Sequence, residues 1–105
     1  MQLKNLITRA KETFNTRIYR SRIYEWLGKE ICEDDVRFLS NQIASAYKKV
    51  KDPNISHFRL CRAVDGLPSE EYRKVKDSGC CGFIDCKVTN PINDHTYYFG
   101  FNYGH

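Results

Sequence analysis

The chain has 105 residues, of which 41% are hydrophobic and 29% are charged. These values suit one compact domain over residues 1–105 and argue against global disorder. No apolar run approaches the roughly 20 residues that cross a bilayer, so the sequence gives no reason to expect a membrane partner.

The N-terminal stretch lacks the continuous apolar segment of a secretory signal. Its amphipathic, basic character also fits a mitochondrial presequence, but the spacing of its apolar residues favours an ordinary helix. The chain has an odd set of cysteines: Cys32, Cys61, Cys80, Cys81 and Cys86. An odd set without a secretory signal favours free thiols in a reducing compartment. We therefore expect a cytoplasmic protein.

The first 28 residues carry two apolar stripes at helical spacing. The first consists of Leu3, Leu6, Ile7, Ala10 and Phe14. The second is shifted by one position and consists of Tyr19, Ile23, Trp26 and Leu27. Asn15 is a suitable N-cap and Thr16 disfavours helix interiors, so we predict a break between two helices, the second ending at Gly28. One long helix that rotates its contact face is the alternative.

A third helix is predicted over residues 33–51, because acids gather at its start and lysines at its end. Residues 57–64 alternate between apolar and polar, which predicts a half-buried strand with Arg62 as an awkward inward residue. After a turn, Ser69 is expected to cap a short helix.

The C-terminal part is predicted to form a β-hairpin with arms over residues 80–89 and 96–103 and a loop over residues 90–94. The expected fold class is therefore α+β. Three N-terminal helices would pack on one face of a small antiparallel sheet that ends in this hairpin. The pattern leaves the strand order open.

The net charge of +4 is concentrated near the N-terminus. Residues 1–24 hold six basic residues and one acid, or +5, which leaves −1 for the rest of the chain. Arg17, Arg20 and Tyr24 share one helical face, with Arg22 to one side. Such a face suits phosphates or an acidic partner, with tyrosine for stacking. A merely solvated helix face is nevertheless the favoured interpretation, and no helix-turn-helix or RNP motif makes the patch a specific nucleic-acid module.

The segment 97–103 is rich in aromatic residues. Tyr97, Phe99, Phe101 and Tyr103 share one face of the predicted strand, which suits the core. The favoured interpretation is that this strand packs as an integral part of the core. The alternative is an exposed aromatic contact surface for a protein or ligand, for which Tyr98, on the opposite face, is the binding residue that we expect.

Zinc binding would draw on Cys80, Cys81, Cys86 and His95. Their Cys-Cys-x4-Cys spacing lacks the paired knuckles of structural zinc sites, so core or half-buried thiols are the favoured interpretation. The sequence contains no G-x-S-x-G elbow, P-loop or H-E-x-x-H motif. We therefore expect no cofactor and no enzymatic activity.

The small size, the basic helical start and the terminal segment from Gly79 to His105, ending Gly-Phe-Asn-Tyr-Gly-His, resemble the small accessory proteins of tailed bacteriophages and prophages. This resemblance implies a bacterial cytoplasm and a role in binding host machinery, for instance in blocking a defence system. It assigns no function to any single residue.

These observations lead to three hypotheses. The first is a non-enzymatic protein that binds and inhibits a host protein or sequesters a small acidic ligand, and homo-oligomers are compatible with it. Its contacts would come from Arg17, Arg20, Arg22, Tyr24 and Tyr98. The second is a nucleic-acid-binding regulator that uses the same basic helices. The third is a zinc- or thiol-dependent protein.

Overall fold

The computed structural model describes residues 3–50, 53–78 and 82–103, and it has an α+β fold. The described elements in chain order are α1 (Leu3–Leu27), α2 (Glu33–Lys48), β1 (Pro53–Arg62), α3 (Glu70–Ser78), β2 (Phe83–Thr89) and β3 (Thr96–Tyr103). None of the described helices is long and apolar enough to cross a membrane.

The three strands form one antiparallel sheet in the order β1-β3-β2. The central strand β3 pairs with β2 from Phe83 opposite Asn102 to Thr89 opposite Thr96. On its other side β3 pairs with β1, with a register irregularity between Asn54 and Arg59. The strand that carries most of the aromatic residues of the sheet therefore lies in its middle.

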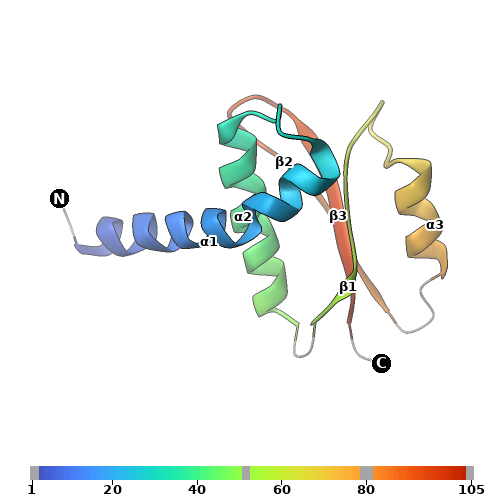
Figure 1. Cartoon of the computed structure of the whole chain (residues 1–105), viewed down its shortest axis with the longest axis horizontal. Coiled ribbons are helices and arrows are strands. Elements are labelled where there is room, and N and C mark those ends of the chain that lie inside the picture. Colours follow the sequence, from blue (N-terminus) through green and yellow to red (C-terminus); the bar gives the residue numbers. More distant parts are fainter. Residues whose placement is uncertain (1–2, 51–52, 79–81, 104–105) are drawn as a thin grey trace.

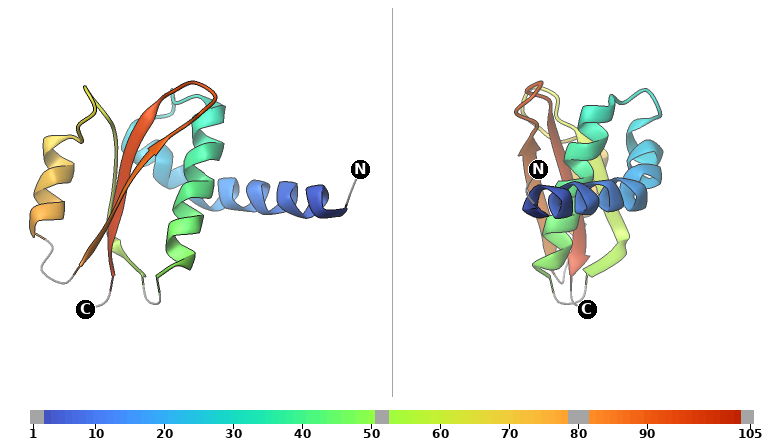
Figure 2. Two further views of the ribbon diagram at one scale, coloured as in Figure 1. Left: turned by 180° about the vertical axis from the view of Figure 1, so that it is seen from behind. Right: turned by 90° about the vertical axis from the view of Figure 1, so that its left-hand side faces the viewer.

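The elements are arranged in three layers. Figure 1 shows α2 and the C-terminal half of α1 over one face of the sheet, with α3 on the opposite side. The left-hand view of Figure 2 shows the same order from behind. From the sequence we expected helices on one face of the sheet only. The position of α3 on the other face differs from this prediction.

The main core lies between the sheet and the first two helices. It alternates along β3, as a strand with one face on this layer requires. The buried residues of this core are Ile23, Val36, Leu39, Ile43, Phe58, Leu60, Tyr97, Phe99 and Phe101. Ile84, Cys86 and Val88 of β2 pack against it from the same face.

The predicted break near Asn15–Thr16 is wrong, because α1 runs unbroken from Leu3 to Leu27. The polar side chains at this point find partners without interrupting the helix. The Thr16 hydroxyl donates to the Glu12 carbonyl at 2.8 Å, and the Asn15 amide donates to Asn41 of α2 at 3.1 Å. The prediction of three N-terminal helices therefore fails: two precede the sheet, and α3 lies between β1 and β2.

The strand predicted over residues 57–64 is observed four residues earlier at its start, as β1 over Pro53–Arg62, whereas the following boundaries lie closer to the prediction. Helix α2 begins at Glu33 with three acids in its first turn. The hydroxyl of Ser69 accepts a 3.2 Å hydrogen bond from the Tyr72 amide at the start of α3, as a cap does. Strand β3 spans the predicted residues, while β2 begins at Phe83 and the predicted start of that arm at Cys80 and Cys81 lies outside the described residues.

The expected exposure of Tyr98 is wrong, because the layer formed by α3 covers its face of the sheet. Tyr98 is only 9% exposed, and its hydroxyl donates to the Gly66 carbonyl at 2.6 Å. Its ring lies 5.9 Å from that of Tyr72 in α3. On the same face, a Cβ at Gly100 would approach the Phe83 ring to 2.4 Å, so a side chain at this position is excluded.

Candidate functional site

The N-terminal half of α1 extends beyond α2 and away from the sheet (Figures 1 and 2). This half and the turn that follows it carry apolar side chains that the described chain does not cover: Ile7 is 49%, Phe14 61% and Ile18 46% exposed. Ala10 is also exposed and lies between them in the helical pattern. We call Ile7, Ala10, Phe14 and Ile18 the outer stripe.

The outer stripe and the buried stripe of α1 lie on opposite sides of the helix. Phe14 and Ile23 are nine residues apart, or about two and a half turns at 3.6 residues per turn, and so project in opposite directions. Ile23 is fully buried in the core. The apolar pattern therefore changes sides along α1. The outer stripe faces solvent, and the buried stripe faces the core.

The predicted basic face is only partly available for binding. Arg20 forms an ion pair with Glu33 and donates to the Tyr24 hydroxyl at 2.7 Å. The hydrogen bonds that Arg20 donates to the Glu33 carboxylate raise the pKa of Arg20 and lower the pKa of Glu33. Arg22 is half-buried. Of the predicted binding residues, Arg20 and Tyr24 are thus engaged within the fold.

Other basic residues on α1 remain unpaired. Arg9, Lys11 and Arg17 are exposed, and none forms an ion pair with another residue of the described chain. Arg9 and Arg17, together with Arg37 of α2, line a shallow groove of about 730 Å³ between the two helices. Lys11 and Arg17 therefore border the outer stripe, whereas Arg9 projects toward the groove on the other side of α1.

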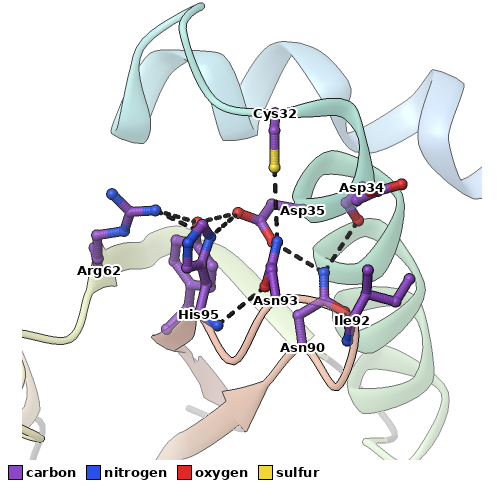
Figure 3. A network of polar contacts seen from close by, with 9 residues as sticks. Cys32, Asp34, Asp35, Arg62, Asn90, Ile92, Asn93 and His95 are labelled. Atoms are coloured by element: carbon purple, nitrogen blue, oxygen red, sulfur yellow. Dashed lines mark hydrogen bonds and ion pairs between the residues drawn. The ribbon is translucent and has the colours of Figure 1, made fainter.

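A second candidate site surrounds Asp35 at the start of α2 (Figure 3). Its carboxylate is fully buried and accepts four hydrogen bonds. Oδ1 accepts from the side-chain amides of Asn90 and Asn93, both at 2.9 Å. Oδ2 accepts from the Tyr97 hydroxyl at 2.6 Å and lies 2.8 Å from His95 Nδ1. We call these five residues the carboxylate network.

The network keeps Asp35 ionised. Burial by itself raises the pKa of this carboxyl, but the hydrogen bonds from His95, Tyr97, Asn93 and Asn90 outweigh it and hold the pKa well below its usual range. With Asp35 ionised, His95 Nδ1 is the donor in their contact. The network fastens the loop between β2 and β3 to the first turn of α2.

Cys32 and Arg62 complete the surroundings of Asp35. Cys32 occupies the N-cap of α2, and its Sγ lies 3.8 Å from the Asn93 amide. Arg62, at the end of β1, approaches His95 Nδ1 to 3.2 Å and stacks over the Tyr97 ring at 5.6 Å. A cavity of about 380 Å³ opens beside them, lined by Leu27, Glu30, Ile31, Cys32, Asp35, Arg62, His95 and Tyr97.

The predicted zinc residues do not come together within the described chain. Cys86 is half-buried on the core side of β2 and lines a separate cavity with Ala46, and burial raises the pKa of its thiol. His95 belongs to the carboxylate network instead. Cys80 and Cys81 lie outside the described residues.

Sequence reasoning missed the residues that build the network. Asp35 stands among three acids in the first turn of α2, where the helix dipole alone explains an acid. Asn90 and Asn93 fit an ordinary loop. The loop 90–95 does contain one signal, three side chains that can donate hydrogen bonds: Asn90, Asn93 and His95. The sequence of the loop does not indicate which residue accepts these bonds.

Comparison of the chain with protein-family models, curated proteins and solved structures finds no match. The function must therefore be inferred from the two sites themselves.

Proposed function

We propose that this chain is a non-enzymatic binding protein that inserts the outer stripe of α1 into an apolar groove of an acidic partner protein. The proposal depends on one observation, the exposure of Ile7, Phe14 and Ile18 on the side of α1 that faces away from its own core. A helix in water normally turns its apolar side inward, so an outward stripe on a projecting helix suits an external partner.

The spacing of the stripe supports a helix-in-groove contact. Its residues follow one another at intervals of three, four and four positions, which is the anchor pattern of amphipathic helices that bind in grooves. Phe14 is the largest and most exposed of them and would be the central anchor. Burying such a side chain contributes roughly 1.5–3 kcal/mol.

The charges beside the stripe favour an acidic protein over other occupants. In a symmetric pair of α1 helices joined by the outer stripe, Lys11 and Arg17 would face like charges. A membrane surface would need a broad apolar face, whereas this stripe presents about one apolar residue per turn. A nucleic acid offers phosphates for the arginines but no apolar groove for Phe14.

The resemblance to phage accessory proteins suggests where the partner belongs. In that setting the partner is a host protein in the bacterial cytoplasm, and binding blocks its activity. Arg20 and Tyr24 then stabilise α1 against α2, through the bonds that Arg20 makes with Glu33 and Tyr24. Arg17 remains as the exposed basic contact from the set expected on sequence grounds.

The test is affinity capture from a bacterial lysate, followed by direct binding measurements with the purified captured protein. Phe14→Glu should weaken binding by about 10- to 100-fold, the equivalent of losing one buried aromatic side chain. Ile92→Glu is the matched control, because Ile92 is 73% exposed and lies in the loop between β2 and β3. It should bind like the wild-type chain.

Three results would overturn the proposal. The first is a Phe14→Glu variant that binds the captured protein as tightly as the wild type does. The second is a homodimer in sedimentation that Phe14→Glu dissociates, which would assign the stripe to a second copy. The third is binding to anionic vesicles, or salt-sensitive binding to duplex DNA, that disappears with Phe14→Glu or Arg17→Glu, which would assign it to a membrane or a nucleic acid.

A further inference from the structure

Three side chains with different donor atoms converge beside the first turn of α2 (Figure 3). The Cys32 sulfur, an Asp35 carboxylate oxygen and a His95 ring nitrogen all lie within 4.8 Å of one another. Thiolate, imidazole and carboxylate are the protein ligands of zinc, at about 2.0–2.3 Å from the ion. Tetrahedral ligands then stand roughly 3.3–3.8 Å apart. Rotation of the exposed Cys32 side chain would bring its sulfur within this distance, and His95 Nδ1 and Asp35 Oδ2, now 2.8 Å apart, would separate by about 0.5 Å.

The carboxylate is already oriented as a ligand requires. Carboxylates that bind metals are themselves held by outer hydrogen bonds, and such partners fix the ligand before the ion arrives. Asn90, Asn93 and Tyr97 hold Asp35 in this way, at 2.9, 2.9 and 2.6 Å. A metal site also needs room for a further ligand, and the adjoining cavity of about 380 Å³ provides it.

From this arrangement we propose that Cys32, Asp35 and His95 bind one zinc-class divalent ion. It is a site independent of the outer stripe. The ion takes the place of the proton between His95 Nδ1 and Asp35 Oδ2, which are now 2.8 Å apart. That proton moves to Nε2, so the imidazole stays neutral, and the thiol of Cys32 releases its proton to water. The two anionic ligands balance the two charges of the ion.

One neighbouring group opposes the ion. Arg62 places its guanidinium 3.2 Å from His95 Nδ1, and its positive charge repels a cation at that position. Arg62 is exposed at the end of β1, and it would have to leave its contacts with the Tyr97 ring and hydroxyl to turn away into solvent. Substitution of Arg62 should therefore strengthen zinc binding. General damage to the fold would not produce this effect.

The experiment measures zinc stoichiometry and affinity of the full-length chain by competition with a chromophoric chelator, and the absorption spectrum with Co²⁺ in place of zinc. The wild-type chain should bind one ion and show the sulfur-to-cobalt charge-transfer band. Cys32→Ser should abolish the band and weaken zinc binding by more than the roughly 10- to 100-fold that loss of an outer partner costs. Because Cys32 is exposed, we expect Cys32→Ser to fold like the wild-type chain.

Two further kinds of variant distinguish this site from metal binding at Cys80, Cys81 and Cys86. Arg62→Gln should tighten zinc binding by about tenfold, since it removes a nearby positive charge. Cys86→Ser and the pair Cys80→Ser and Cys81→Ser are the matched controls and should bind as the wild type does. The proposal is overturned if the wild type gives no charge-transfer band, if only the control variants lose the ion, or if Arg62→Gln weakens binding.

Discussion

Tyr97→Phe removes one hydroxyl from the carboxylate network and leaves the aromatic ring in the core. The hydroxyl donates to Asp35 Oδ2 at 2.6 Å, and both residues are buried. Hydrogen bonds to charged groups contribute about 1.5–3 kcal/mol, so we expect the free energy of unfolding to fall by about 2 kcal/mol. For a domain of this size the melting temperature then drops by about 10 °C.

The loss of unfolding free energy caused by Tyr97→Phe should depend on pH and become smaller in acid. The folded-state pKa of Asp35 lies below its unfolded value of about 3.9, so the ionised carboxylate stabilises the fold above about pH 4. That stabilisation is lost as the pH falls through the folded-state pKa. Because Tyr97→Phe raises this pKa, the difference in stability between variant and wild type should narrow below about pH 4.

The assay is urea denaturation followed by the fluorescence of Trp26, the single tryptophan, from neutral to acid pH. Tyr72→Phe is the matched control. The Tyr72 hydroxyl also donates to a carboxylate, Asp85 at 2.7 Å, but that side chain is 28% exposed and paired with Lys76. The control should cost about 1 kcal/mol. The reasoning is refuted if Tyr97→Phe lowers the free energy of unfolding by no more than Tyr72→Phe does. It is also refuted if the loss for Tyr97→Phe stays constant on acidification.

Three further substitutions test the fold by chemical denaturation. Gly100→Ala should cost about 2–3 kcal/mol, because its Cβ would lie 2.4 Å from both a backbone oxygen and the Phe83 ring; an unchanged midpoint would contradict the tight layer on this face. Ser69→Ala removes the cap of α3 and should cost about 1 kcal/mol. Arg20→Ala breaks the exposed pair with Glu33 and should cost less than about 1 kcal/mol, with a larger loss contradicting its solvent exposure.

Elements with a consistent pattern were predictable from the sequence. The acids at the start of α2 and the alternation along β3 each point to one structure, and both elements lie where they were expected. In α1 the local signals at Asn15 and Thr16 were misleading. A polar residue breaks a helix only when its side chain competes with the backbone, and here Asn41 and the Glu12 carbonyl provide partners that preserve it.

The candidate sites required the tertiary structure. Tyr98 is buried because α3 covers the second face of the sheet, and no periodicity in β3 reports where α3 packs. Asp35 and His95 are 60 positions apart in sequence, and their contact follows from how the loop between β2 and β3 meets α2. Exposure of Phe14 likewise depends on α1 continuing past α2, which a helical pattern does not reveal.

The position of β3 has a consequence for the order of folding during synthesis. Strands β1 and β2 both pair with β3 and not with each other, and β3 follows both in the chain. On the ribosome, neither of the earlier strands has a pairing partner until residues 96–103 have emerged. The two N-terminal helices can associate while translation continues, whereas the sheet and the core beneath it assemble in one late step.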